Sequence, residues 1–254
     1  TRARRSMRVP VLALRVSASV GSVVLAYECL KPKPPLPTAS QRSCTFNALA
    51  PTYDRDVEWD ESISGVLELR QEIAAYAKGK VLEVAGGTGR NLAFYTDAVR
   101  ELLIIDTSVE MLKVGASKVA ALRAEGRAAG LSAVTLAVGD AEALPCESEE
   151  YDTVLDTFGL CSFELPQAAL EEMKRCCKPS GDIVLLERGV SSWDLIACWQ
   201  RHRLNRHVVS WGSYWDRDIL ACVEAAGLRV VELRRTNCGT IYFIRCRRPD
   251  APPD

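Results

Sequence analysis

Short apolar runs alternate with amphipathic stretches over most of this chain, and this pattern constrains the fold more than any other feature of the sequence. Repeated β–α alternation predicts an α/β fold, in which helices cover both faces of a mainly parallel sheet. Seven runs have the length and composition of buried strands, at 81–85, 102–105, 134–138, 153–155, 183–186, 230–233 and 241–244. Helical stretches are expected at 63–77, 91–95, 109–124, 166–177 and 217–226.

The end of the sheet should differ from the rest. No helical stretch separates the last two runs, and turn-forming residues at 234–239 predict a hairpin, so the final strand should run antiparallel. We therefore expect a Rossmann-like, seven-stranded, mainly parallel sheet with an antiparallel last strand. In such sheets the ligand lies beyond the carboxyl ends of the strands, so the residues that follow each run are the candidate site.

A glycine-rich stretch, Glu-Val-Ala-Gly-Gly-Thr-Gly, follows the first run and ends at Gly89. Its glycines allow a sharp turn and a close approach of the backbone to a ligand. A helix expected at 91–95 would point its N-terminal N–H groups at that ligand. A dinucleotide fingerprint would continue with a small residue where Leu92 stands, so the pattern disfavours an NAD-dependent dehydrogenase.

Acidic residues follow the second and third runs. Asp106 is placed to accept hydrogen bonds from the two hydroxyls of a ribose, or to cap the next helix, a role that Ser108 could take instead. Asp140 could accept a hydrogen bond from an adenine amino group, although a lone Asp at such a position is more often a turn residue.

The N-terminal part has a different composition. Five arginines and an apolar stretch precede the first acidic residue, Glu28, which is typical of a targeting segment. Residues 9–30 are long enough to form a marginal single membrane span or a helix that packs on a partner. Four prolines between Lys31 and Pro37 then predict a stiff linker. We therefore divide the chain into a targeting or membrane-anchor segment at 1–30, a proline-rich linker at 31–45, a folded domain at 46–248 and a tail at 249–254.

Charge and cysteine content limit the case for nucleic-acid, lipid and metal binding. A net charge of −1 gives no case for the whole chain as a nucleic-acid or acidic-lipid binder. The basic cluster at 201–207 leaves RNA, phospholipid and a protein partner open as local contacts. Ten cysteines without a C-x-x-C pair, and only two histidines, offer no metal-ligand spacing, so we expect reduced thiols and no metal site.

Five segments in this order resemble the class I S-adenosylmethionine-dependent methyltransferases of the ubiquinone/menaquinone-methylase-like group. The segments begin at Val81, Ile105, Val138, Tyr151 and Cys177, and the resemblance covers roughly 46–246. It implies S-adenosylmethionine, or its product S-adenosylhomocysteine, as the cofactor. The chain departs from the family at Ala85, where a glycine is usual. The cofactor-binding residues that the resemblance implies are Tyr53, Glu83, Ala85, Gly86, Gly87, Gly89, Asn91, Asp106, Thr107, Met111, Asp140, Ala141 and Thr157.

Residues 211–219 and 239–242 look more narrowly like the single-span methyltransferase-like proteins of the mitochondrial inner membrane known from yeast. This resemblance implies a mitochondrial protein with membrane contact through residues 9–30, and a cytoplasmic location is the alternative. The implied function is methyl transfer to a small-molecule, lipid-like or protein acceptor. A catalytically silent subunit of a large mitochondrial membrane or ribosomal assembly is the second hypothesis.

Methyl transfer is an in-line displacement that needs alignment, desolvation and, where the acceptor carries a proton, a base. Four candidate bases are expected near the carboxyl edge of the sheet: His207, Glu187, Asp156 and Asp54. We favour His207, because a histidine titrates near neutral pH. The alternative is that His207 belongs to a solvated basic helix face.

Overall fold

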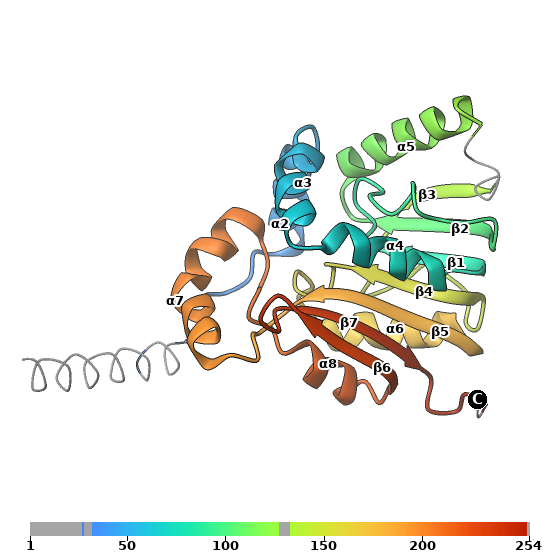
Figure 1. The fold of residues 1–254 in the computed structure, drawn as a ribbon. Helices are drawn as coiled ribbons and strands as arrows, with labels where there is room; N and C mark the ends of the chain where they lie inside the picture. The colour runs from blue at the N-terminus through green and yellow to red at the C-terminus, as the bar shows by residue number, and fades with distance from the viewer. Residues whose placement is uncertain (1–26, 28–31, 127–132, 253–254) are drawn as a thin grey trace, which may run out of the picture.

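The computed structural model describes residues 27, 32–126 and 133–252, and a seven-stranded sheet lies at its centre (Figure 1). The strands are β1 (Gly79–Val84), β2 (Val99–Asp106), β3 (Val134–Val138), β4 (Tyr151–Thr157), β5 (Cys177–Arg188), β6 (Arg229–Thr236) and β7 (Ile241–Arg247). Their order is β3-β2-β1-β4-β5-β7-β6. The pairs among β1 to β5 are parallel, whereas β7 runs antiparallel to both β5 and β6. The predicted mainly parallel sheet with an antiparallel last strand is confirmed.

Helices cover both faces of the sheet, because the central strands bury side chains on both sides. On β5, Ile183 and Leu185 pack into one core, and Val184 and Leu186 into the other. This alternation follows from the two-residue period of a strand. Helices α6 and α8 supply the first core, and α4 and α5 supply the second. The helices are α2 (Ala39–Leu49), α3 (Tyr53–Ile63), α4 (Val66–Tyr76), α5 (Val109–Ala124), α6 (Pro166–Cys176), α7 (Asp194–Trp211) and α8 (Ile219–Ala225).

The prediction of a helix at 91–95 is wrong. The chain there forms consecutive turns, in which the N–H of Gly89 donates to the carbonyl of Gly86 and that of Leu92 to Gly89. The side chain of Asn91 is fully buried and donates to Glu83, which ties this short segment to the sheet instead of to a helical ladder.

The stretch interpreted as a linker, at 31–45, also differs from expectation. Helix α2 begins inside it, after Thr38, whose side chain forms a capping box with Gln41. Before the helix the chain lies against the domain: Lys33 forms an ion pair with Asp216 at 3.0 Å, and the carbonyl of Pro34 accepts a hydrogen bond from the Tyr214 hydroxyl. The prolines therefore hold an extended segment along the surface of the domain.

The expected membrane segment at 9–30 lies outside the described residues, apart from Tyr27. Of the helices in the described part of the chain, none combines the length and the hydropathy that crossing a bilayer requires.

Candidate functional site

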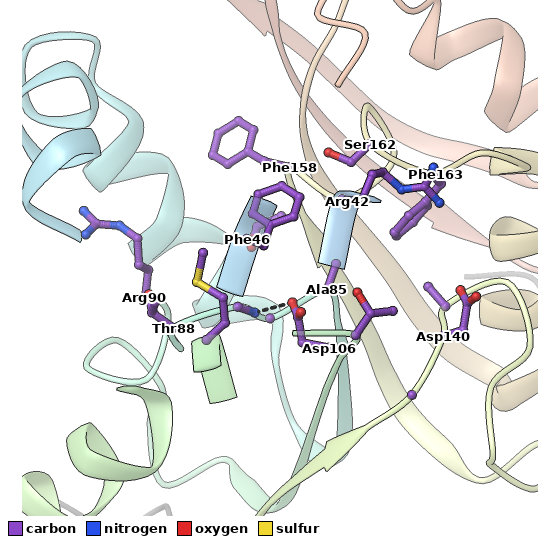
Figure 2. A pocket seen from close by; sticks show the side chains of 18 of the residues that line it. Arg42, Phe46, Ala85, Thr88, Arg90, Asp106, Asp140, Phe158, Ser162 and Phe163 are labelled. Carbon is purple, nitrogen blue, oxygen red and sulfur yellow. Dashed lines mark hydrogen bonds between the residues drawn. The ribbon is translucent and has the colours of Figure 1, made fainter. Parts of the chain in front are cut away.

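A pocket opens at the carboxyl ends of the parallel strands, where β1 has β2 as its neighbour on one side and β4 on the other (Figure 2). This is the switch point at which open α/β sheets bind their ligands. About 930 Å³ of space there is not filled by protein atoms, part of it open to solvent. Its walls come from the segments that follow β1, β2, β3 and β4, and from α2, α3 and α4.

The glycine loop after β1 forms one wall. Gly87 has a φ of 55° and donates its N–H to a carboxylate oxygen of Asp106 at 2.9 Å. Ala85 has a φ of 48°, a left-handed conformation that costs a non-glycine residue about 1 kcal/mol or more. The alanine that replaces the usual glycine is therefore accommodated with local backbone strain at the edge of the pocket.

The sequence left open whether Asp106 or Ser108 caps the next helix. The structure gives the capping role to Ser108 and leaves Asp106 at the pocket. The second oxygen of Asp106 accepts the N–H of Ser108 at 2.7 Å, so two backbone groups fix the carboxylate at the pocket wall. Burial raises the pKa of Asp106. The hydroxyl of Ser108 accepts the N–H of Met111 at 3.2 Å and caps α5. Asp106 is thus oriented toward the pocket, while Ser108 begins the helix.

The segment after β3 forms the adjacent wall. Asp140 and Ala141 line the pocket, and Thr107 and Met111 line it from the side of β2 and α5. One carboxylate oxygen of Asp140 accepts the N–H of Glu142 at 2.9 Å, so this residue also makes the turn that we considered as its alternative role. The same pocket thus has both a carboxylate and a buried thioether in its lining, which suits a flat heterocycle that carries an amino group.

A buried arginine also lines the pocket, and the sequence did not indicate it. Arg70 is 3% exposed and forms an ion pair with Glu61 at 2.7 Å. Its guanidinium also donates to the side chains of Asn91 at 3.0 Å and Thr157 at 3.4 Å. Arg90 also lines the pocket and pairs with the same Glu61, so two guanidinium groups share one buried carboxylate and this part of the pocket can receive a further carboxylate.

Three residues expected to touch the cofactor lie behind the pocket wall instead. Glu83, Gly89 and Asn91 are not among the lining residues. The Glu83 carboxylate accepts hydrogen bonds from Asn91 at 2.8 Å and from the Tyr95 hydroxyl at 2.6 Å, and burial raises its pKa. Asn91 then meets Arg70 through its oxygen. The three positions support the wall rather than form it.

Helices α2 and α3 close the pocket from the N-terminal side, where Tyr53 lines it as expected. At the next position, Asp54 accepts a hydrogen bond from Thr88 at 2.6 Å and forms ion pairs with Arg90 at 3.3 Å and Lys118 at 2.5 Å. Partial burial opposes ionisation of Asp54, but the hydrogen bonds from Lys118 and Thr88 outweigh it and lower the pKa. We call these contacts the Asp54 clasp, since they join α3 to the glycine loop and to α5.

Aromatic side chains form the remaining side. Phe46 from α2, with Phe158 and Phe163 from the loop after β4, lines this side together with Arg42 and Ser162 (Figure 2). The three rings come from segments more than a hundred positions apart in the chain. This side therefore favours an apolar group over a highly charged one.

A pair of carboxyl groups lies directly beneath that loop. Asp156 and Glu187 are fully buried, and both accept the N–H of Gly159 at 3.2 Å, while Asp156 also accepts that of Leu160 at 3.1 Å. Among the described residues, the second oxygen of Glu187 has no hydrogen-bond partner. Burial raises the pKa of Asp156 to about 7 and that of Glu187 well above its usual range. The pair therefore retains a proton at neutral pH.

The structure places His207, the favoured candidate base, outside the pocket lining. His207 lies in α7, away from the pocket lining, where its ring stacks on Trp215 at 4.3 Å and bonds the Ser213 hydroxyl at 3.0 Å. Burial lowers the pKa of His207 to about 4, so it is neutral at pH 7. The other candidate bases, Asp54, Asp156 and Glu187, also lie outside the lining residues.

The sequence of this chain is similar to those of known methyltransferases. Residues 82–185 match the family described as "Methyltransferase domain". The chain is 31% identical over 215 residues to the mitochondrial methyltransferase OMS1 of Saccharomyces cerevisiae, a match that covers 80% of this chain and 45% of the yeast protein. It is 32% identical over 171 residues to the ubiquinone/menaquinone biosynthesis C-methyltransferase UbiE of Syntrophotalea carbinolica, covering 63% of this chain and 68% of that protein. The chain thus spans less than half the length of the yeast relative.

Among solved structures, the [4+2]-cyclase SpnF superimposes with a TM-score of 0.66 at 16% identity, covering 86% of this chain and 99% of SpnF. This likeness concerns the fold. A cyclase on the same fold illustrates that the reaction has to be argued from the site.

Proposed function

Because this chain belongs to the class I S-adenosylmethionine-dependent methyltransferases, whose cofactor is S-adenosylmethionine, we propose that it methylates a small, apolar, lipid-like acceptor in mitochondria. The observation that carries the proposal is the convergence of a fixed carboxylate, Asp106, and a buried cation, Arg70, on one pocket. These two charges match the two ends of a nucleoside joined to an amino acid.

The residues present fit this cofactor. Asp106 would accept hydrogen bonds from the ribose hydroxyls, and Asp140 would accept one from the adenine amino group. Gly87, whose Cβ position is free of close neighbours, leaves room for the amino-acid part. Arg70 would bind its carboxylate. Met111 and Thr107 with Ala141 would pack around the base, and Tyr53, Ala85, Gly86 and Thr157 would complete the contact surface.

The cofactor supplies a methyl group already activated by a sulfonium, so the protein contributes alignment and exclusion of water. Phe46, Phe158 and Phe163 keep the acceptor side apolar, and α2 and α3 cover it. An apolar methyl acceptor would bury its surface against these rings. A base is needed only for an acceptor that loses a proton, and we assign no such role to His207.

A mitochondrial location is supported by the name of the yeast relative and by the basic, acid-free composition that precedes Glu28. Within mitochondria, we propose the inner membrane as the specific location. The alternative, a silent subunit of a large assembly, is disfavoured because such a subunit has no need for a glycine loop and strand-end acids arranged around an open pocket.

Calorimetry with S-adenosylmethionine tests the site, with a matched pair of glycine substitutions. Gly87 and Gly126 have left-handed φ values of 55° and 67°, so valine strains the backbone at both, but only Gly87 lines the pocket. We expect Gly87→Val to weaken binding at least 100-fold and Gly126→Val to leave it unchanged. Equal affinity of the two variants would refute the assigned site.

The acceptor class is tested separately, with tritiated methyl groups and a detergent extract of mitochondria. Label from the cofactor should enter the organic-solvent phase with wild type. It should not enter with Gly87→Val. Transfer into protein or RNA alone would contradict a lipid-like acceptor while leaving the cofactor site intact.

A further inference from the structure

The outer face of α7 carries a concentration of exposed apolar side chains. Leu195, Trp199 and Val209 are 78%, 51% and 77% exposed, and Trp193, directly before the helix, is 61% exposed. Of the eleven large hydrophobic residues that the described structure exposes, three are therefore on this helix and a fourth directly precedes it. Leu195, Trp199, His202, Arg206 and Val209 follow a spacing of three and four residues, which places them on one helix face.

The same face is positively charged. Arg203 and Arg206 are exposed, and Asp194, in the first turn, is the only acidic residue of the helix. Arg201 is already engaged, since it forms an ion pair with Asp216. Exposed tryptophan and leucine side chains together with arginines are the residue types by which helices at a membrane interface contact anionic lipids.

The N-terminal part of the chain approaches the domain on this side. The extended segment before α2 runs beside α7 (Figure 1), with Lys33 paired to Asp216 and Pro34 bonded to Tyr214 just beyond the end of the helix. The sequence that precedes this segment is the one with five arginines, an apolar stretch and no acid before Glu28.

This side also adjoins the pocket. Gly212 ends α7, and a Cβ placed there would lie 3.7 Å from Cγ of Arg42. Arg42 lines the aromatic side of the pocket. The C-terminal end of α7 therefore lies next to a residue that lines the pocket.

We propose that α7 docks the domain on an anionic lipid bilayer, with Trp193, Leu195 and Trp199 in the interface and Arg203 and Arg206 toward the lipid phosphates. Tryptophan is suited to this position because its ring is apolar while its N–H stays hydrated. RNA fits the face less well. Two exposed arginines provide few phosphate contacts, and exposed leucine and valine side chains gain nothing from a phosphate backbone. The inference is independent of the methyl acceptor.

Quenching of tryptophan fluorescence by brominated lipid tests the contact in the full chain. The N-terminal 30 residues contain no tryptophan, so membrane binding by that segment alone gives no signal from it. Vesicles of phosphatidylcholine with ~20 mol % phosphatidylglycerol, brominated on the acyl chains, should quench wild type. The double variant Trp193→Phe, Trp199→Phe should lose more than half of this quenching. A matched control, Trp59→Phe, removes an indole that is 72% exposed on α3 and should keep it.

Equal quenching of the double variant and wild type would overturn the proposal. A second variant tests the charge: Arg203→Gln with Arg206→Gln should raise the lipid concentration at half-maximal quenching at least fivefold, about the effect of one interfacial cation. An unchanged lipid requirement would contradict it. So would a mobility shift with mixed-sequence RNA that depends on these two arginines while vesicles give no quenching.

Discussion

Replacing Glu187 by glutamine should remove a pH dependence of stability that arises from the buried carboxyl pair beneath the loop after β4. Asp156 and Glu187 share the N–H of Gly159, and burial raises the pKa of Asp156 to about 7 and that of Glu187 further. In the unfolded chain both groups lose their protons near pH 4. The folded protein therefore holds a proton that the unfolded chain has lost, and its free energy of unfolding falls as the pH rises.

The size of the effect follows from the number of protons retained. Each retained proton lowers the free energy of unfolding by about 1.4 kcal/mol per pH unit, so one proton held between pH 5 and 7 gives about 3 kcal/mol. Glutamine keeps an oxygen for Gly159 but has no titratable proton, so the contribution of the proton on Glu187 is removed. Between pH 5 and 7 the Glu187→Gln variant should therefore gain about 3 kcal/mol relative to wild type.

Urea unfolding at several pH values measures this difference. His207 also affects stability in this range, but with the opposite sign, and its contribution cancels when the variant is compared with wild type. Parallel curves for the two proteins between pH 5 and 7 would refute a shared proton in the pair.

Three further predictions concern individual side chains. Asp106→Asn should weaken binding of S-adenosylmethionine about 10- to 100-fold, because an amide donor replaces an oxygen that faces a backbone N–H; unchanged affinity in calorimetry would contradict the assigned role. His207→Phe keeps an aromatic ring against Trp215 and should gain stability relative to wild type as the pH falls from 6.5 through about 4, because the variant lacks the group whose pKa burial lowers, with methyl transfer at pH 7 retained. A loss of activity on that change would restore His207 as a candidate base. Ala85→Gly should stabilise the protein by about 0.5–1 kcal/mol in chemical unfolding, since it relieves a left-handed alanine, and a destabilised variant would show that no strain is stored there.

The sheet and its strand-end residues could be predicted because their signals are local. Each strand is a short apolar run, and Asp106 follows its run directly while Asp140 stands one residue further on. Parallel strands bring their carboxyl ends to one edge, so sequence order alone gathers these residues into one site.

Other parts of the site could not be predicted because they depend on contacts between distant segments. Arg70 lies in the middle of an amphipathic helix, where a charged residue normally faces water, and its burial depends on Glu61 and Asn91. Phe46 belongs to α2, whose sequence has almost no amphipathic pattern. His207 was favoured for its titration range, a property of the residue type, whereas catalysis requires a position in the pocket.

The Asp54 clasp has a consequence for turnover. Helix α3 is fastened to the glycine loop and α5 by Thr88, Arg90 and Lys118, and it carries Tyr53 over the pocket. If a molecule the size of a nucleoside leaves by displacement of α3, the rate of its departure depends on the rupture of these partly exposed ion pairs. Added salt weakens such pairs. An enzyme limited by departure of its spent cofactor would then run faster in salt, up to the point where the unlatched helix no longer shields the reaction from water.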